Sequence, residues 1–511
     1  MELYWMLISL FLSLLLSLAV MKYRFFQSHN RKKRLPPGPP TFPWLGNLLW
    51  LRKFVADVEG VPRQLIDKYG PILTLYLGTR PTIFVADRSL AYEALVQKGS
   101  VFSDRPPATD VERMFTSNQH TIASASYGPL WRLLRRNLTM EILHPSRVKS
   151  FAEGRKWVRE LLIKRLRSRE ERDEPVRVVE MFQHASFCLL LFMCFGEKVE
   201  ESTVKAIERV QRRLITATTF KFIVLGVLRR LGRFIFPKWW KMVLELIDER
   251  ERLMAPFVRA RVGLTEEEKK KSSCDFCYVD TLLALELPEE GGRKLTESEM
   301  VTLCFEMLTA GTDTTWTTMQ WILANLVNHQ DKQAKLVDEI EGVVGKDGEI
   351  SEEDLEKMPY LKAVIMEGLR RHPPGHLLLP HAVSEETTLG GYAIPENATI
   401  YFVVSEIGVD KEAWEDPLEF RPERFLKEGV DITGSREIKM MPFGVGRRIC
   451  PGLGLGMLHL EYLVANLVRE FEWKPKKDGE IIDLSETFEF TVVMKNPLEA
   501  KVISRRKEEA N

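Results

Sequence analysis

A single cysteine, Cys450, lies in the glycine-rich stretch "PFGVGRRICPGLGLG" (residues 442–456). The flanking glycines permit tight backbone angles that expose amide N–H groups to the sulfur, and the dipole of the helix predicted to follow favours thiolate over thiol. A thiolate held in this way can be a nucleophile or the axial ligand of a metal. A nucleophile needs a neighbouring base; no histidine is close in sequence, although His459 lies on the following helix.

The loop resembles the haem-thiolate signature of the cytochrome P450 family. It matches F-x-x-G-x-R-x-C-x-G, with Phe443, Gly446, Arg448, Cys450 and Gly452 in register. The resemblance implies that Cys450 is the axial ligand of the iron of haem b. It also implies that Arg448 faces a haem propionate and that Phe443 packs beside the macrocycle.

A second motif lies inside the long apolar stretch "VTLCFEMLTAGTDTTWTTMQWILANLV" (301–327). Its centre, "AGTDTT", resembles the oxygen-activating segment of the family. The resemblance implies that Asp313 and Thr314 form a catalytic acid–alcohol pair that relays protons, and that Ala310 and Gly311 leave space beside the haem. Asp and Thr in a helix are usually surface residues, but the apolar surroundings argue against that interpretation here.

Three further residues are expected at the haem propionates. Trp131 and Arg135, in "WRLLRR", are four residues apart on one face of a predicted helix. They match the family's W-x-x-x-R, whose members hydrogen-bond a propionate. His381, in "LLLPHAV", stands where the family has a basic residue for the same purpose. The alternative for His381 is an ordinary core or surface histidine.

A structural network is also predicted. Glu367 and Arg370, in "EGLR", are three apart on a predicted helix and can pair. Arg424, in "FRPERF", would complete the family's buried Glu–Arg–Arg network, which supports the scaffold. An ion pair on the protein surface is the alternative for these residues.

These residues require helices and a few short strands to position them. The pattern predicts a fold that is mainly α with small β-sheets (α+β), and by resemblance the cytochrome P450 fold, with one large catalytic domain over 41–511. A β-hairpin is expected at 72–86 and paired short strands at 387–404. Long helices are expected at 301–327, 361–371 and 453–473.

The N-terminus predicts a membrane anchor. Residues 3–21 contain no charge and would span about 28 Å as a helix, close to the thickness of a bilayer. Basic residues follow this run, including Arg31–Arg34, which places the rest of the chain in the cytosol and argues against the alternative of a cleaved signal peptide. Residues 22–40 form a basic segment that ends in the proline hinge "LPPGPP". The apolar and basic region 220–240 is either part of the folded body or a surface that dips into the membrane.

Composition narrows the class of protein. The chain has 511 residues, of which 45% are hydrophobic, and a formal net charge of +1. This balance argues against a nucleic-acid-binding protein. Six cysteines are few for this length and indicate a reduced, cytosol-facing protein. For Cys274 and Cys277, which form a C-x-x-C, a solvated loop is favoured over a zinc or redox pair.

The whole layout resembles a plant microsomal cytochrome P450, and "EGLRRHPPGHLLLPHAV" and "FEFTVVMKNPL" are most similar to the plant family numbered eighty-nine. The segment "VVSEIGVD" departs from many plant relatives because it lacks the usual Trp and Arg. The resemblance implies a single-pass monooxygenase of the endoplasmic reticulum membrane that inserts one atom of O2 into a hydrophobic small molecule. Its electrons would come from NADPH through cytochrome P450 reductase, with cytochrome b5 as a further partner. Predicted pocket walls are 115–122, 301–309, 375–379 and 488–492.

Two other functions remain as alternatives. One is a P450-fold isomerase or dehydratase that acts on peroxides without a reductase, against which the Asp313–Thr314 pair argues. The other is a non-catalytic haem-binding membrane protein. Basic residues on the sulfur side of the haem are candidates for reductase docking, with an ordinary solvated face as the alternative; they are Arg132, Arg136, Lys439 and Arg447.

Overall fold

The computed structural model describes residues 35–41, 47, 50, 60–77, 80–218, 232–271, 274, 276–427 and 429–505. The described residues form two compact units. The smaller contains the residues up to Pro106 together with Leu379–Val403, and the larger contains Pro107–Leu378 and the residues from Val404 onward. The predicted anchor, 3–21, lies outside the described residues, as do 22–34 of the basic segment and 219–231 of the apolar and basic region.

The smaller unit is built on a four-stranded sheet with the order β1-β2-β9-β6. Strands β1 and β2 pair antiparallel, β2 pairs parallel with β9, and β9 pairs antiparallel with β6. The predicted hairpin at 72–86 is confirmed, and so are the paired short strands further along the chain. The strands of this unit are β1 Ile72–Leu77, β2 Arg80–Val85, β6 His381–Ala382, β7 Thr387–Leu389, β8 Tyr392–Ile394 and β9 Thr399–Phe402, with helices α3 Gly60–Tyr69 and α4 Arg88–Tyr92.

The proline hinge is packed against this sheet. The Thr74 amide of β1 donates to the Pro37 carbonyl at 2.8 Å. A Cβ atom at Gly38 would lie 2.0 Å from the Thr74 carbonyl oxygen, so only glycine permits this approach. The hinge is therefore more than a stiff spacer, because part of it is fixed to the edge of the folded body.

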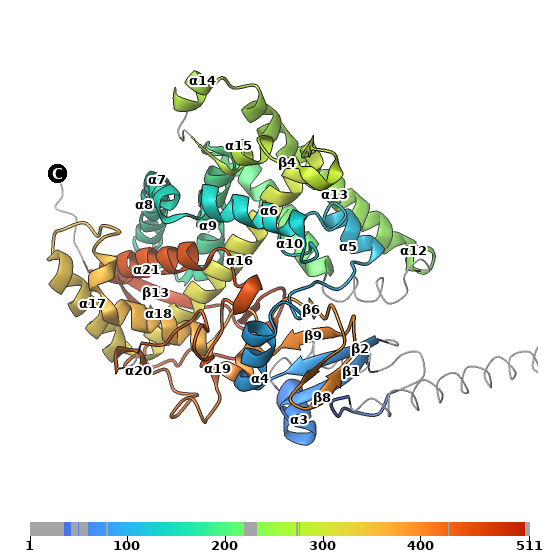
Figure 1. Cartoon of the computed structure of the whole chain (residues 1–511). Coiled ribbons are helices and arrows are strands. Elements are labelled where there is room, and N and C mark those ends of the chain that lie inside the picture. The colour runs from blue at the N-terminus through green and yellow to red at the C-terminus, as the bar shows by residue number, and fades with distance from the viewer. Residues whose placement is uncertain are drawn as a thin grey trace, which may run out of the picture. The chain divides into compact units, whose positions relative to one another are not determined.

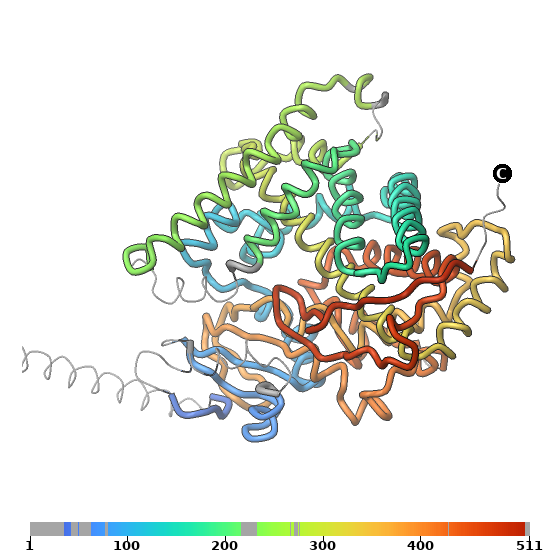
Figure 2. The backbone as a smooth tube through the Cα atoms, turned by 180° about the vertical axis from the view of Figure 1, so that it is seen from behind, coloured from blue at the N-terminus to red at the C-terminus, as the bar shows by residue number. Residues whose placement is uncertain are grey.

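The larger unit is organised around α16, Glu297–Asn328. Figures 1 and 2 show this helix passing through the interior of the unit. Thr296 and Glu299 form a capping box at its start. The apolar helix α9, Val178–Phe195, packs along it. Helices α13, α18 and α21 also contact α16, so most of its side chains are buried.

The predicted helices at 301–327 and 361–371 are confirmed as α16 and α18, and the one at 453–473 is confirmed as α21 up to Glu470, because residues 471–473 belong to β10. The helices of the larger unit are α5 Asp110–Phe115, α6 Pro129–Asn137, α7 Pro145–Ser150, α8 Ala152–Glu170, α9, α10 Glu201–Thr218, α12 Gly232–Ile235, α13 Pro237–Val262, α14 Glu266–Lys271, α15 Tyr278–Leu283, α16, α17 Gln330–Val344, α18 Pro359–Arg371, α19 Val404–Gly408, α20 Arg424–Lys427 and α21 Leu453–Glu470. Its strands are β3 Val176–Arg177, β4 Glu286–Leu287, β5 Arg293–Lys294, β10 Phe471–Pro475, β11 Glu486–Phe488, β12 Val492–Met494 and β13 Glu499–Ser504.

One helix of the described chain, α9, is long and apolar enough to cross a membrane by length and composition. However, 78% of it is buried inside the protein. This burial is what a core helix requires, because an apolar helix in a large domain finds its partners among other helices.

The C-x-x-C pair is buried, so the prediction of a solvated loop for it was wrong. Cys277 is fully buried and its thiol donates to Asp280 Oδ2 at 3.2 Å, while Cys274 donates to the Phe276 carbonyl at 2.9 Å. Arg261 pairs with the same aspartate at 2.8 Å. Burial and the neighbouring carboxylate raise the pKa of the Cys277 thiol, which makes it unreactive. Among the described residues, no group of three or more His, Cys, Asp and Glu side chains is arranged to hold a metal ion.

Candidate functional site

The Cys450 loop is a tight turn that leads into α21. Gly444 and Gly446 have φ of +67° and +76°, in the left-handed region that favours glycine. The Cys450 amide donates to the Phe443 carbonyl at 2.8 Å, which closes the turn. The Phe443 ring lies against the start of α21, where a Cβ atom at Gly456 would be 3.5 Å from it. The loop thus holds a half-buried thiol at a fixed place.

In the protein chain alone, the side chain of Cys450 favours the thiol over the thiolate. Burial raises its pKa, while the Gly452 N–H and the charge of Arg135 act in the opposite direction. In the chain without a metal ion, desolvation therefore has a larger effect on this pKa than the groups that favour the thiolate. A bound metal ion would reverse the balance, since it deprotonates a coordinating thiol.

Arg135 is the cation whose charge lowers the pKa of the Cys450 thiol. Its guanidinium is half-buried, and burial lowers its pKa while the thiolate form of Cys450 raises it. Within the described chain it makes no hydrogen bond and no ion pair. A desolvated cation without a partner is unfavourable, so this position is suited to an anionic group that the protein chain does not supply.

Trp131 and Arg448 lie against each other and are called the cationic cluster below, because Arg448 carries a charge. The Arg448 guanidinium lies 4.6 Å from the centre of the Trp131 ring. Both side chains donate to one carbonyl, that of Ile122, with distances of 3.2 Å for Trp131 Nε1 and 3.3 Å for Arg448. Arg448 also donates to the Ala125 carbonyl at 2.7 Å. The structure thus brings two of the sequence-predicted residues together through a loop that no motif marked.

The carboxyl of Asp313 is buried in α16. It accepts a hydrogen bond from the indole of Trp316 at 3.1 Å. Burial raises its pKa to about 6, against the effects of Trp316 and of the Arg212 charge, which lower it. A group with this pKa exchanges protons close to neutral pH, as a proton relay must.

Thr314 and Asp313 are adjacent in sequence but share no hydrogen bond in the described structure. The Thr314 hydroxyl donates to the Ala310 carbonyl at 2.7 Å. Ala310 is exposed although the helix around it is buried, which indicates open space beside this turn. Gly311 has another role than expected, because a Cβ atom there would lie 2.8 Å from Leu190 of α9. Its missing side chain lets two helices pack closely.

His381 belongs to the smaller unit. It is buried on β6, and its Nδ1 lies 2.6 Å from the Phe102 carbonyl oxygen. Because a carbonyl only accepts, Nδ1 carries the proton and Nε2 of the neutral ring is an acceptor. Binding a carboxylate through Nε2 would therefore require the imidazolium form.

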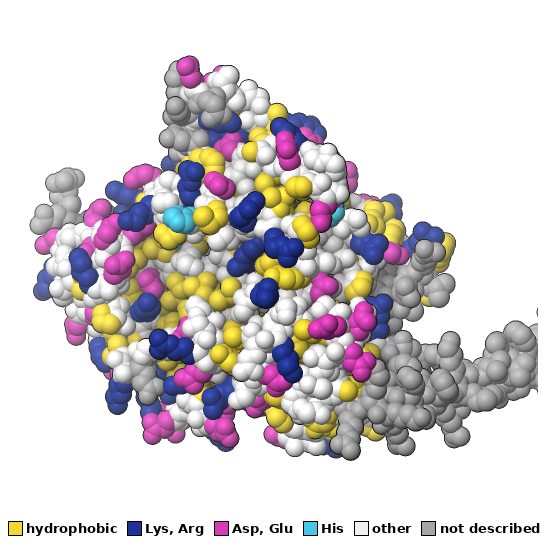
Figure 3. Space-filling view, viewed as in Figure 1, with side chains coloured by type: hydrophobic (Ala, Val, Ile, Leu, Met, Phe, Trp, Pro, Cys, Tyr) yellow, Lys and Arg dark blue, Asp and Glu magenta, His cyan; other side chains and the backbone are white. Residues whose placement is uncertain are grey.

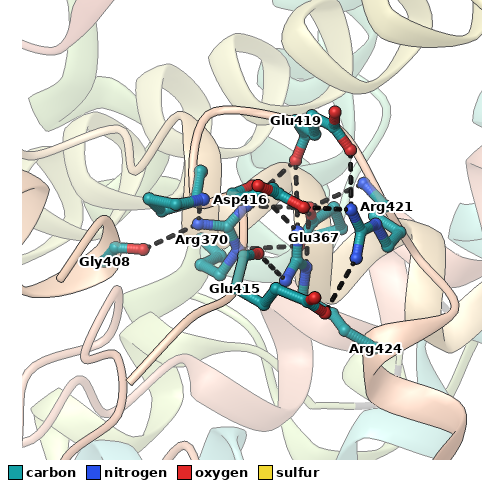
Figure 4. A network of polar contacts seen from close by, with 9 residues as sticks. Glu367, Arg370, Gly408, Glu415, Asp416, Glu419, Arg421 and Arg424 are labelled. Atoms are coloured by element: carbon teal, nitrogen blue, oxygen red, sulfur yellow. Dashed lines mark hydrogen bonds and ion pairs between the residues drawn. The ribbon is translucent and has the colours of Figure 1, made fainter. Parts of the chain in front are cut away.

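The buried Glu–Arg–Arg network is confirmed (Figure 4). Glu367 and Arg370 on α18 have fully buried side chains, and the guanidinium donates to both carboxylate oxygens at 2.7 and 2.8 Å. Arg424 donates to the same carboxylate at 3.2 Å. Arg370 further donates to the carbonyls of Gly408, the last residue of α19, and Pro417, so the network fixes the end of α19 and the Pro417 loop to α18.

One acidic residue beside this site, Glu306, belongs to none of the sequence motifs. Glu306 of α16 accepts hydrogen bonds from the amides of Ile122 and Ala123, at 2.9 and 2.6 Å. The available signal was its position, since it is the sole charged residue between Glu299 and Asp313 in an apolar stretch.

The residues of the larger unit fit a haem. They supply a thiol for a metal in a rigid turn, an unpartnered half-buried guanidinium for an acidic group, and open space beside Ala310. A single group would satisfy all three features if it carries a metal ion for the thiol, acidic side chains for the guanidinium and a body that fills the open space.

Comparisons with known proteins identify the family. The family model described as Cytochrome P450 matches residues 36–503. Cytochrome P450 89A9 of Arabidopsis thaliana is 50% identical over 94% of this chain and 95% of its own length. The phenylacetaldehyde oxime monooxygenase CYP71AN24 of Prunus mume and flavonoid 3'-monooxygenase of Arabidopsis thaliana are each 32% identical; the first alignment covers 92% of this chain and 89% of the relative, the second 91% of each.

Solved structures show the same fold. A zebrafish cytochrome P450 determined with progesterone has a TM-score of 0.73 and 23% identity, and the match covers 90% of this chain and 99% of that one. The family match spans nearly all of the chain, and named monooxygenases are among its plant relatives. The chain therefore belongs to the cytochrome P450 family, among the plant monooxygenases whose haem iron is bound by a cysteine thiolate.

Proposed function

We propose that the protein is a single-pass, ER-anchored monooxygenase that inserts one atom of O2 into a hydrophobic small molecule. Electrons from NADPH would arrive through cytochrome P450 reductase, with cytochrome b5 as a further donor. The observation that carries the proposal is the Cys450 thiol in its closed turn, beside the unpartnered Arg135. The residues from 41 to 511 would form the catalytic domain.

Five residues of the larger unit would hold the cofactor. When bound, haem b supplies the iron at which O2 is reduced and split. Cys450 would bind its iron, and Arg135 and Arg448 would bind its propionates through charge-assisted hydrogen bonds. Trp131, whose single indole N–H donates to the Ile122 carbonyl, would bind a propionate in exchange for this bond. Phe443 would pack against the ring. His381 is proposed for a propionate on the family resemblance alone.

Asp313 and Thr314 would deliver the two protons with which one oxygen atom of O2 is released as water, while the other atom enters the substrate. The Asp313 carboxyl takes up a proton near neutral pH because burial disfavours its charged form. The Thr314 hydroxyl retains its lone pairs while it donates to Ala310, so it can accept a hydrogen bond from a water molecule in the open space. A proton then passes from one residue to the other through water, because the two share no direct hydrogen bond.

The substrate is proposed to be apolar and at least partly aromatic. Phe115 and Phe305, on two of the predicted pocket walls, meet edge to face at 6.1 Å. Such a pair offers ring contacts to a flat ligand. Two relatives carry names of aromatic substrates, phenylacetaldehyde oxime and flavonoids. Binding spectra with plant lipids, terpenoids, phenolics and tetrapyrroles would rank the candidate classes.

The reductase would dock on the surface over α6. A groove of about 550 Å³ lies there, with Leu130 and Leu133 on its floor and the exposed Arg132 and Arg136 at its edge. Figure 3 shows Lys and Arg side chains gathered over this helix. Glu289 and Glu290 also line the groove, so the proposal rests on the exposed guanidinium groups of α6, which suit a partner with an acidic surface.

A membrane anchor is proposed at 3–21, and the short helix α12 is proposed as a second contact. Phe234 and Ile235 on α12 are 69% and 54% exposed, which is unfavourable in water and suitable for a lipid surface. Deleting residues 2–21 should release part of the protein from the membrane fraction. Replacing Phe234 and Ile235 by Ser in the truncated chain should release the rest, and retention of this variant would contradict the α12 contact.

The decisive experiment is spectroscopic. The CO complex of the reduced protein should show the Soret band of a thiolate-ligated haem, and Cys450→Ala should lose it. A band at the position of a histidine-ligated haem in folded wild-type protein would contradict the proposal. With added reductase, NADPH use coupled to a hydroxylated product supports a monooxygenase, whereas turnover of peroxides without reductase would support an isomerase or dehydratase.

The docking surface has its own test. Arg132→Glu with Arg136→Glu should slow reduction of the haem by reductase by about tenfold or more at low salt. The matched control is Lys241→Glu with Arg252→Glu on α13, where both side chains are exposed. Equal reduction rates for the two double variants would refute docking at α6.

A further inference from the structure

The loop between α5 and α6 is held by one face of α16. Thr302 Oγ1 lies 2.7 Å from Ser117 Oγ, and Glu299 Oε1 lies 2.8 Å from His120 Nδ1. Together with Glu306, these residues occupy positions i, i+3 and i+7, which lie on the same side of a helix. Three polar side chains in a row on a largely apolar helix therefore all contact one loop.

The loop needs such anchors because its backbone is strained. Ser117, Asn118 and Gln119 have φ of +47°, +61° and +66°, which is the left-handed region. Three successive residues with side chains adopt this conformation only when the surroundings hold them there. The polar contacts to α16 provide that restraint.

Glu306 makes the strongest of these contacts. Its two carboxylate oxygens accept from two successive backbone amides, Ile122 at 2.9 Å and Ala123 at 2.6 Å. Hydrogen bonds to a charged acceptor are stronger than neutral ones, and two parallel bonds fix orientation as well as distance. The peptide groups at Ile122 and Ala123 are thus locked to α16.

The same loop orients the cationic cluster. The Ile122 carbonyl accepts from Trp131 and Arg448, and the Ala125 carbonyl accepts from Arg448. A carboxylate on α16 therefore fixes the amide side of Ile122, while the carbonyl side of this residue fixes the guanidinium and the indole. The chain of contacts from Glu306 to Arg448 contains no gap.

We infer that Glu306 is a positioning residue for the cofactor, because it sets the place of the carbonyls that orient Trp131 and Arg448. This inference rests on the proposed function, in which Arg448 binds a haem propionate while its guanidinium lies against the Trp131 ring. Glu306 is also seven residues before Asp313, on the same side of α16. One helix thus positions both the proton donor and the cationic groups that hold the cofactor.

The test uses the haem-loaded protein and Glu306→Gln. The glutamine accepts one amide hydrogen bond and presents a donor to the other, so the loop loses one anchor and gains a repulsion. Hydrogen exchange at the Ile122 and Ala123 amides should become about tenfold faster, and haem loss to an excess of apomyoglobin should accelerate by a similar factor. The matched control is Glu297→Gln on the same helix, an exposed residue that pairs with Arg259 at 2.7 Å and does not contact the loop.

The inference is overturned if Glu306→Gln matches the Glu297→Gln control in haem loss while exchange at the two amides rises, because the loop would then not position the cofactor. Unchanged exchange overturns it as well. If Glu306→Gln does not fold, Glu306→Asp decides, since it keeps the charge but is too short for both amides; wild-type exchange and haem loss would overturn the inference. Wild-type protein that folds without a thiolate-ligated haem would instead refute the proposed function.

Discussion

Replacing Asp313 by Asn should stabilise the protein at neutral pH. Burial raises the pKa of this carboxyl from the ordinary 3.8 to about 6, so ionisation of the folded protein is unfavourable. At about 1.4 kcal/mol for each pH unit, the charged carboxyl costs about 3 kcal/mol at pH 7.5. Asn keeps the acceptor for Trp316 but adds an amide donor without a partner, which costs about 1 kcal/mol. The expected net gain is about 2 kcal/mol.

The sign of the pH dependence follows from proton binding. Between the two pKa values the folded protein binds more protons at Asp313 than the unfolded chain does, so this group lowers stability as pH rises and has its full cost above about pH 6. At about pH 4.5 the cost has fallen to about 1 kcal/mol. The advantage of Asp313→Asn should therefore shrink by about 2 kcal/mol between pH 7.5 and pH 4.5, which removes most of it.

Urea unfolding of the haem-loaded protein at these two pH values measures the effect. The comparison is between Asp313→Asn and wild type, with the exposed residue Asp338 on α17 changed to Asn as the control for a surface carboxylate. An equal free-energy change at both pH values, or a loss of stability at pH 7.5, would refute the assignment of a buried carboxyl that titrates near pH 6. Activity should fall in the same variant because the proton donor is gone.

Three further substitutions test other contacts. Glu367→Gln leaves the guanidinium groups of Arg370 and Arg424 without their carboxylate. The free energy of unfolding should fall by about 3–5 kcal/mol, which is measured as a lower denaturation midpoint. Wild-type stability would contradict the buried network. Gly311→Ala places a methyl group 2.8 Å from Leu190 and should lower the free energy of thermal unfolding by about 1–3 kcal/mol. In a Leu190→Ala background the same change should cost less. If the losses from the two substitutions simply add, the two side chains do not touch. The hydrogen bond to Glu299 raises the pKa of His120, so its stabilisation is full below about pH 6.5 and lost as pH rises through the higher folded value. His120→Gln should thus cost more, by up to about 1 kcal/mol, at pH 6 than at pH 8.5, and a flat difference would contradict the pair.

Motifs with fixed spacing were predictable from the sequence. The Cys450 loop, the Asp313–Thr314 dipeptide and the pairing of Glu367 with Arg370 each depend on residues close together in the chain. Local geometry then decides most of their arrangement, because a turn or one helical face brings such residues together whatever surrounds them. The helices and the hairpin followed from periodicity for the same reason.

Burial was the main source of error. A solvated loop was expected at Cys277, yet it is fully buried. Gly311 was assigned to the space beside the cofactor, yet it allows α9 to approach. Each error came from local reasoning about a position whose neighbours are distant in the chain.

The sequence by itself determined the family, the thiol that marks the cofactor site and the acidic residue in the central helix, because these depend on residue type and short spacing. The tertiary structure decided how they are held. Ile122 and Ala125 contribute backbone carbonyls, which every residue possesses and no sequence pattern reveals. Glu306 gains its partners only when a loop more than 180 residues earlier in the chain packs against α16. The pKa of Asp313 likewise depends on desolvation, which exists only after the surrounding helices have excluded water.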